Sequence, residues 1–314
     1  MAAILAGACV KPAAAADTWR FGVVDAKGEA GIFYMPTKFG AKYGIDIQMM
    51  SFASSTTPVK ALISNDLDVF TSAPAVALIA MSRGAKIKFV GCTLPGPGYM
   101  LYSAKDITSL AQLKGKNIAV SGPGSMPDLY AREVLHQNGI PENEVNFVNS
   151  GGGTDRYKAL VAGVVQATAT TGEFAPEAKK HGYHILASAH DTMPNFLRDC
   201  LVVADQTIAD RRQGLAHFLA ANMDGMRYVT THRKETIELA HKVAHLPVGN
   251  TGPAVIYDEA AAEKAVDPTL AVPVKKLQWI EDMLVRQHVL SKSHDVTAFV
   301  DEGPRQEAQK LLKP

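Results

Sequence analysis

The chain has 314 residues, a formal net charge of +1 and 47% apolar side chains. This length suggests about two domains or lobes, and the apolar content is sufficient for buried cores. Lys and Arg are spread along the chain without a basic stripe, so the charge pattern gives no indication of nucleic-acid binding. No apolar run reaches the roughly 18 residues that a membrane-spanning helix needs.

The first 16 residues differ in composition from the rest of the chain. Ala2–Val10 is a small apolar run, and the alanines at 13–16 precede Asp17. This A-x-A pattern is typical of the end of a secretory signal peptide, although the charged start is missing; a disordered alanine-rich leader is the alternative. Cys9 follows a weak match to a lipoprotein box, so a lipid anchor is the less favoured alternative. We therefore expect an exported protein whose leader ends at residue 16.

Cysteines and histidines give no metal-binding motif. Without the leader, Cys92 and Cys200 remain, and they fit either a disulfide in an oxidising compartment or two buried thiols. The ten histidines include two pairs with helical spacing, but no HExxH motif or Cys/His cluster accompanies them. We expect neither a metal site nor a cofactor.

Strands and helices are predicted to alternate in the first third of the chain. Apolar segments predict strands at 19–24, 45–52, 67–71 and 87–92, with helices at 32–42, from 58 to about 65 and at 75–83. This alternation predicts βαβ units around a parallel sheet. The segment "LPGPG" at 94–98 is typical of a crossover or hinge, and a strand is predicted at 99–103.

The pattern then starts again. "ALISNDLDV" at 61–69 is matched by "ALVAGVVQA" at 159–167, which lies 98 residues later. The strand at 21–24 is matched at 118–121, and "YGI" at 43–45 is matched by "NGI" at 138–140. Three similarities in the same order at nearly one offset predict two lobes of similar build, each a small doubly wound sheet.

The stretch 117–138 predicts a strand, a Gly/Ser turn and an amphipathic helix. Ser125 and Asp128 fit a capping box, and Gly122 and Gly124 permit a tight turn. Such a helix start is an anion site when its N–H groups are free. A plain strand–helix connection that binds nothing is the alternative.

Six segments at the predicted carboxyl ends of strands are rich in Gly, Ser and Thr. Each alone fits ordinary helix capping, but together they predict a cleft lined by hydroxyls and backbone N–H groups. The candidate ligand-binding residues are Asp25, Lys27, Gly28, Ser54, Ser55, Thr56, Ser72, Ala73, Ser121, Gly122, Gly124, Ser125, Met126, Gly152, Gly153, Thr154, Gly172, Glu173 and Phe174.

From residue 205 onward the chain reads as helical. Helices are predicted at 209–231, 233–243, 257–266 and 274–288, and their Met, Tyr and Trp side chains are expected to pack the helices together. We expect the chain to divide into a leader at 1–16, a first lobe at 17–97, a second lobe at 98–204, and a helical part at 205–314 that packs back on the first lobe.

Three sequence segments carry a family resemblance. They are "ALISNDLDVFTSAP", "LKGKNIAVSGPGS" at Leu113–Ser125, and "ALVAGVVQATATTGEF". The chain resembles the solute-binding proteins of ABC importers in the nitrate/sulfonate/taurine class, which share their fold with the NMT1/THI5-like proteins. Two positions depart from the family's G-x-x-D pattern: Asn65 replaces Gly before Asp68, and Gln166 replaces Asp after Gly163.

The resemblance implies a periplasmic, two-lobed α/β protein of the type II, Venus-flytrap class. Such a monomer would close over a small solute and present it to an ABC importer permease at the inner membrane. By the same resemblance, the solute contacts come from the candidate loops named above. No catalytic residue and no nucleic-acid partner is implied.

An enzyme and a sensing domain are the two other classes of function. An enzyme of the pyrimidine synthase branch carries a "CCCFC" segment, which this sequence lacks, and no G-x-S-x-G motif is present. A sensing domain would need a transmitter segment, and we find none. Convergence of Asp25, Asp128 and Glu173 on the cleft would fit an enzyme. The favoured alternative is that Asp128 caps its helix and Glu173 is a charge on a loop.

The solute is expected to be a monoanion with an apolar or aromatic body, or alternatively a pyrimidine-like heterocycle. Lys27 is the one basic residue in the predicted cleft loops, which argues against a strongly charged anion held by arginine. The expected apolar wall consists of Phe33, Tyr34, Tyr99, Met126 and Phe174.

Overall fold

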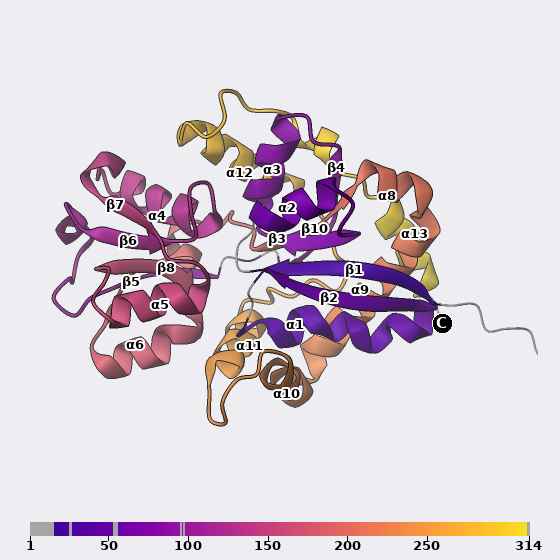
Figure 1. Cartoon of the computed structure of the whole chain (residues 1–314), viewed down its shortest axis with the longest axis horizontal. Coiled ribbons are helices and arrows are strands. Elements are labelled where there is room, and N and C mark those ends of the chain that lie inside the picture. The colour runs from indigo at the N-terminus through magenta and orange to yellow at the C-terminus, as the bar shows by residue number, and fades with distance from the viewer. Residues whose placement is uncertain (1–15, 25–26, 53–55, 95, 97, 313–314) are drawn as a thin grey trace, which may run out of the picture.

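Two five-stranded sheets, each flanked by helices, form two lobes that lie side by side (Figure 1). The computed structural model describes residues 16–24, 27–52, 56–94, 96 and 98–312, so the candidate residues Asp25, Ser54 and Ser55, as well as Cys9, lie outside the described residues. The predicted two-lobed α/β architecture is confirmed.

The first sheet has the order β2-β1-β3-β10-β4. Its strands are β1 (Asp17–Val24), β2 (Ile45–Phe52), β3 (Val69–Ser72), β4 (Ile87–Leu94) and β10 (Asp199–Ala204). β1 runs parallel to β2 and β3, whereas β10 runs antiparallel to β3 and β4. Because β10 lies between β3 and β4, residues 199–204 belong to the first sheet. The expected end of the second lobe at residue 204 is therefore wrong, since this last strand is part of the first lobe.

The second sheet has the order β7-β6-β8-β5-β9 and repeats this plan. Its strands are β5 (Tyr99–Ser103), β6 (Asn117–Val120), β7 (Asn146–Asn149), β8 (Ala167–Thr171) and β9 (His184–Ser188). β6 runs parallel to β7 and β8, and β5 runs antiparallel to β8 and β9. Each lobe thus receives one antiparallel strand directly after the chain has crossed from the other lobe.

The chain crosses between the sheets twice, and the first crossing lies at the segment 94–98 that the sequence indicates. The first crossing joins β4 to β5 across 95–98, and the return joins α7 (Ala189–Thr192) to β10. A disulfide links Cys92 on β4 to Cys200 on β10 beside these crossings. This bond settles the alternative of two free thiols.

Helices of the C-terminal third cover the first lobe. α9 packs on the 3-10 helix at Met35–Tyr43, α13 packs on α9, and α12 packs on α3. The helices are α1 (Ala30–Tyr34), α2 (Thr56–Ile63), α3 (Pro74–Ser82), α4 (Met126–Gln137), α5 (Gly153–Val161), α6 (Ala175–His181), α8 (Asp205–Asp210), α9 (Arg212–Thr231), α10 (Arg233–Val243), α11 (Gly252–Ala262), α12 (Val274–Arg286) and α13 (Gly303–Leu311). The helix expected at 257–266 begins five residues earlier, because Pro253 suits the first turn of a helix.

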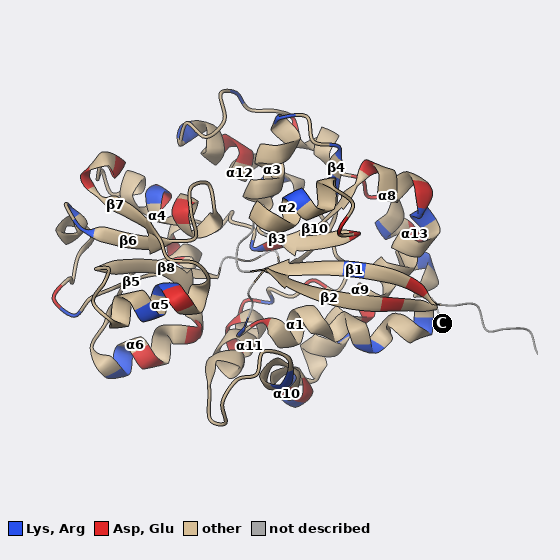
Figure 2. Cartoon of the chain, viewed as in Figure 1, with Lys and Arg blue, Asp and Glu red and all other residues tan. Residues whose placement is uncertain are grey.

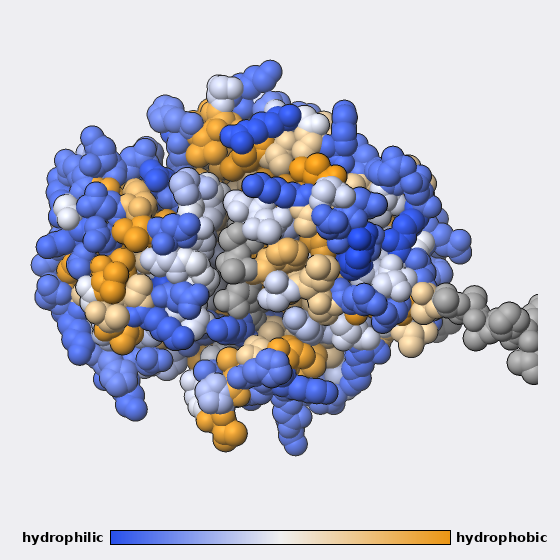
Figure 3. Space-filling view, viewed as in Figure 1, coloured by the Kyte–Doolittle hydropathy of each residue, from blue (hydrophilic) through white to orange (hydrophobic). Residues whose placement is uncertain are grey.

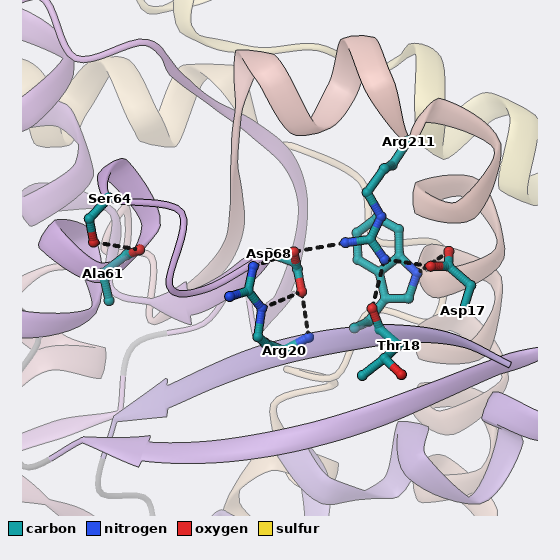
Figure 4. A network of polar contacts seen from close by, with 8 residues as sticks. Asp17, Thr18, Arg20, Ala61, Ser64, Asp68 and Arg211 are labelled. Carbon is teal, nitrogen blue, oxygen red and sulfur yellow. Dashed lines mark hydrogen bonds and ion pairs between the residues drawn. The ribbon is translucent and has the colours of Figure 1, made fainter. Parts of the chain in front are cut away.

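An ion-pair network joins the first lobe's sheet to the segment between α8 and α9 (Figure 4). The Asp68 carboxylate accepts hydrogen bonds from the backbone N–H and the guanidinium of Arg20, and it also pairs with Arg211. Arg211 bonds Asp17 as well. Because Asp68 is buried, the network fixes the start of β3 beside β1.

The surface has mixed character. Basic and acidic side chains are interspersed over both lobes (Figure 2), and apolar residues on the viewed face form small separate groups (Figure 3). Within the described residues, no helix is both long and apolar enough to cross a membrane. No group of His, Cys, Asp and Glu side chains suitable for a metal ion occurs among the described residues either.

Candidate ligand-binding site

A cavity of about 80 Å³ lies where the two lobes face each other. Residues of both lobes and Arg198 of the return crossing line it, and most of them follow the carboxyl end of a strand. They are Val24, Lys27, Glu29, Phe33, Ala73, Tyr99, Ser121, Met126, Pro127, Gly152, Gly153, Thr154, Arg156, Thr170, Thr171, Glu173, Arg198 and Asp199. A second pocket of about 450 Å³ shares Lys27, Thr154 and Glu173 with the cavity.

Many of the sequence-predicted residues meet in these two spaces. The cavity is lined by Lys27, Ala73, Ser121, Met126, Gly152, Gly153, Thr154 and Glu173. The second pocket adds Gly28 and Phe174. These residues come from loops of both lobes, as the joint pattern of Gly, Ser and Thr at strand ends predicts.

Other predicted residues lie elsewhere. Thr56 and Gly124 line a separate surface groove beside α2 and α3. Gly122, Ser125 and Gly172 line none of these three spaces, and the Ser72 side chain is not among the described groups. The groove also contains apolar residues of α3, so the turn at 122–124 faces away from the cavity.

The predicted capping box at the start of α4 is not formed. The Ser125 side chain makes no cap hydrogen bond, and its hydroxyl is buried without a partner. The Asp128 carboxylate instead accepts a hydrogen bond of 2.8 Å from the Gly124 backbone N–H and pairs with Arg132, away from the cavity. The tight turn itself is as predicted, since Gly122 and Gly124 have φ of 113° and 73°.

At the start of α4, Met126 and Pro127 line the cavity. The helix start without a side-chain cap at the cavity is that of α5. The N-cap of α5 is Gly152, which has no side chain, and the first intrahelical bond runs from the Arg156 N–H to the Gly152 carbonyl. Gly152, Gly153 and Thr154 all line the cavity. The start of α5 is therefore suited to an anionic group.

Arg156 fixes the position of this helix start. Its Nε donates to the Ala169 carbonyl at 2.8 Å, and its Nη1 donates to the Gly151 carbonyl at 2.7 Å and to the Ser121 hydroxyl. The side chain is buried, so it brings a permanent positive charge to the cavity wall. Sequence reasoning considered the loops alone and missed Arg156, although its place in the first turn after a Gly-rich loop was a signal.

A second buried arginine stands at the crossings. Arg198 Nε pairs with the Glu29 carboxylate, and Nη1 donates to the Gly98 carbonyl at 3.5 Å. Burial raises the pKa of Glu29 in spite of Arg198, and burial together with the charge of Glu29 raises the pKa of Asp199 well above its ordinary value. Arg198 and Asp199 lie in the apolar sequence "FLRDCLVV", which gave no loop signal.

The expected absence of arginine from the cleft is therefore wrong. Arg156 and Arg198 join Lys27 in the cavity, opposed by three acidic residues, Glu29, Glu173 and Asp199. The expected apolar wall is present in part: Phe33, Tyr99 and Met126 line the cavity, whereas Phe174 stacks on Tyr157 at 4.3 Å beside the second pocket. Tyr34 lines neither space.

Several solved structures share this fold. The ligand-binding component of an ABC-type import system from Staphylococcus aureus, solved with zinc bound, is 16% identical; the match covers 93% of this chain and 99% of that one, with a TM-score of 0.75. The periplasmic aliphatic sulphonate-binding protein of Escherichia coli is 19% identical, with 92% and 99% covered and a TM-score of 0.71.

Sequence comparisons give a curated relative and a family. "Outer membrane lipoprotein 2" of Mannheimia haemolytica is 36% identical over 87 residues, which are 27% of this chain and 31% of the relative, so the match spans about a third of that protein. The family model described as "NMT1/THI5 like" matches residues 38–236, which is more than half of the chain. The two-sheet fold, the interlobe cavity and this match together place the chain in the NMT1/THI5-like family.

Proposed function

We propose that this protein is the solute-binding component of an ABC importer. It captures a small organic monoanion in the cavity between the lobes and delivers it to a permease at the inner membrane. The observation that carries the proposal is the cavity itself, which residues of both lobes line with the start of α5, Arg156 and the buried hydroxyl of Thr170. The ABC-type import component and the sulphonate-binding protein that share the fold support the same class.

The solute's anionic group is assigned to the start of α5. The Thr170 hydroxyl faces the same place: it is buried without a partner, and it lies 2.9 Å from where a Cβ on Gly153 would stand. A buried hydroxyl without a hydrogen bond is costly unless a ligand completes it. An oxyanion bound there would accept from both the backbone N–H groups and this hydroxyl.

The solute's body is assigned to the apolar wall of Phe33, Tyr99 and Met126. A cavity of about 80 Å³ corresponds to on the order of half a dozen water-sized groups, which favours a small molecule. Equal numbers of basic and acidic residues in the lining disfavour a polyanion. The aromatic wall also favours a second candidate, a pyrimidine-like heterocycle.

The experiment is a thermal-shift screen of sulfonates, carboxylates and pyrimidines on the purified protein. A true solute at 100 times its Kd should stabilise the folded state by about 2.7 kcal/mol. Thr170→Val should keep the fold and weaken the solute several-fold, since it removes one hydrogen bond. Thr168→Val, two residues earlier on β8 and outside the cavity, is the matched control. Equal affinity of both variants and wild type would place the anion elsewhere.

Export is part of the proposal. We propose that the leader is removed after Ala16, so the mature protein from an exporting host begins at Asp17. N-terminal sequencing tests this directly. A protein that keeps Met1 and stays in the cytoplasmic fraction contradicts both the periplasmic location and the role in import.

A further inference from the structure

A surface groove of about 840 Å³ lies beside α2 and α3 and shares no residue with the solute cavity. These two helices pack on each other in the first lobe and supply most of the lining (Figure 1). Pro123 and Gly124, which precede α4 in the second lobe, line the groove as well. A Cβ on Gly124 would stand 3.6 Å from the Ile79 side chain, so this turn lies next to α3. The groove is therefore built by both lobes.

The lining of the groove is mainly apolar and reaches the surface. Ile63 is 55% exposed, and Ile79 and Val289 are half-buried, so aliphatic side chains meet the solvent here. Exposed apolar surface that is gathered in a groove is stabilised when another molecule covers it. This lining therefore indicates a contact surface.

The charged residues of the groove are all basic. Lys60 on α2 and Arg83 at the end of α3 line it, and no acidic residue is among the described residues of its lining. Both side chains are exposed, and neither forms an ion pair with a residue that the structure describes. In the same lobe, Lys38 and Lys42 each pair with a carboxylate. An apolar groove with two unpaired cations fits an apolar segment that carries carboxylates.

Contacts between the lobes lie close to this groove. Val289 follows α12, which packs on α3 of the first lobe. In the same segment, Gln287 Nε2 donates to the Leu129 carbonyl at 3.1 Å and to the Glu133 carboxylate at 3.2 Å, both on α4 of the second lobe. The shape of the groove therefore depends on how the two lobes are placed relative to each other.

We infer that this groove is the surface on which the membrane subunit of the importer docks. The docking segment of that subunit carries apolar side chains that cover Ile63 and Ile79, and Asp or Glu side chains that pair with Lys60 and Arg83. The inference rests on the proposed function and names the surface that its partner contacts. Because both lobes build the groove, a segment bound in it favours one arrangement of the lobes over the others.

The test is photo-crosslinking of the full chain in its exporting host. Ile63→p-benzoylphenylalanine places the photoreactive group in the groove. Ile185→p-benzoylphenylalanine is the matched control, because this isoleucine on β9 is also exposed and lies outside the groove. We expect position 63 to cross-link a permease peptide that contains Asp or Glu, as identified by mass spectrometry, and position 185 to cross-link none.

Charge reversal tests the two basic residues. Lys60→Glu combined with Arg83→Glu should lower the yield of the cross-link from position 63 about tenfold, because like charges then face each other. Lys105→Glu combined with Lys116→Glu, which changes two exposed lysines of the second lobe outside the groove, should leave the yield unchanged.

Folding and solute binding serve as controls for these variants. Circular dichroism melts establish that both double variants are folded. A solute that the thermal-shift screen identifies should bind both as tightly as wild type, since none of the four residues lines the cavity.

The outcomes separate the inference from the proposed function. A permease cross-link from position 185 instead of 63, or at equal yield from both, overturns the docking surface alone. So does a cross-link from position 63 to lipid or to a second copy of this chain, or a permease cross-link that keeps its yield after charge reversal. If neither position cross-links a permease, affinity purification from detergent-solubilised membranes decides: a permease that co-purifies also overturns the docking surface alone. A protein that captures no permease by either method contradicts the proposed function, and the inference with it.

Discussion

Asp68 and Gln166 occupy the same place in the two lobes and make the same contact with different chemistry. The Asp68 carboxylate accepts from the Arg20 backbone N–H at 2.7 Å, and the Gln166 side-chain oxygen accepts from the Asn117 N–H at 3.2 Å. Gln166 lies 98 residues after Asp68, and Asn117 lies 97 residues after Arg20. In return, the Asp68 N–H donates to the Arg20 carbonyl, and the Gln166 N–H donates to the Asn117 carbonyl, both at 3.0 Å.

The turns before these residues match as well. Asn65 has φ of 63° and Gly163 has φ of 73°, so Asn65 adopts the left-handed conformation that the family's glycine provides. The Asn65 N–H bonds the Leu62 carbonyl, and the Gly163 N–H bonds the Leu160 carbonyl. The predicted internal repeat is therefore confirmed down to single hydrogen bonds.

The first prediction is that the contact of Asp68 contributes more to the unfolding free energy than the contact of Gln166. Asp68→Ala should cost about 2–4 kcal/mol of unfolding free energy, because it leaves Arg20 and Arg211 without a buried partner, although both remain partly exposed. Gln166→Ala should cost about 1 kcal/mol, since one hydrogen bond is lost. Urea titrations measure both, with the exposed Asp66→Ala as control.

Acid should erase the difference between wild type and Asp68→Ala. Burial alone would raise the pKa of Asp68, but the hydrogen bonds and charge of Arg20 and the charge of Arg211 lower it below the ordinary value. A lowered pKa in the folded state means that the stabilisation is present above the unfolded-state pKa and is lost as pH falls through the folded-state pKa. A difference that persists well below pH 2 contradicts this account.

The second prediction concerns the start of α4. Ser125→Ala should change the unfolding free energy by less than about 0.5 kcal/mol, because the buried hydroxyl has no partner to lose. A capping box would instead give a loss of about 1 kcal/mol. Asp128→Ala should cost about 1–2 kcal/mol, since it removes the bond to the Gly124 N–H and the pair with Arg132.

Thermal melts and solute titrations on both variants provide the measurement. Neither residue lines the cavity, so solute affinity should stay unchanged. A loss of affinity in Ser125→Ala would show that the turn at 122–125 reaches the solute after all.

The third prediction concerns the stability of the empty protein. Burial and the charge of Glu29 raise the pKa of Asp199, so the folded state favours the protonated carboxyl. For a carboxyl group with a raised pKa, folding stability is fully present below the unfolded-state pKa and declines as pH rises toward the folded-state pKa. Asp199→Asn should therefore have a higher Tm than wild type at pH 7 and the same Tm near pH 3.

Melts of solute-free protein between pH 3 and 8 measure this effect. Glu29, Arg198 and Tyr99 interact with Asp199, and Glu259 acts on Arg198; the substitution changes none of these groups. An Asp199→Asn variant less stable than wild type at pH 7 would mean that the carboxylate has a stabilising partner within the protein.

The fourth prediction concerns the disulfide. Cys92 and Cys200 enclose a chain segment with a sequence separation of 108 residues, and both side chains are fully buried. Replacing both by Ala should lower the unfolding free energy by about 2–4 kcal/mol, because the unfolded chain regains the freedom that the crosslink removes. Melts of wild type with and without reductant should reproduce the loss. An unchanged Tm in both comparisons would show that the bond contributes nothing.

Much of the fold could be predicted from local sequence. The strands at 45–52 and 99–103 match their predicted bounds, and the loops at strand ends met at the cavity because parallel strands that share an edge of a sheet present their carboxyl ends together. The repeat at 61–69 and 159–167 was visible in the sequence because both segments form the same helix–turn–strand connection, which requires similar residues at matching positions. In these cases each residue's neighbours along the chain carry enough information.

Long-range pairing decided the rest. β10 was not among the strands predicted from the sequence. It pairs between β3 and β4, where Cys200 meets Cys92 from 108 residues earlier in the chain, and this place depends on which edge is open once the other strands have paired. Arg198 and Asp199 entered the cavity with that strand, and at the start of α4 a bond from the Gly124 N–H to the Asp128 carboxylate stands in place of the predicted capping box. The sequence by itself determined the elements, the repeat and the family, whereas the tertiary structure decided which charges share the buried cavity, because burial and charge pairing arise only when distant segments meet.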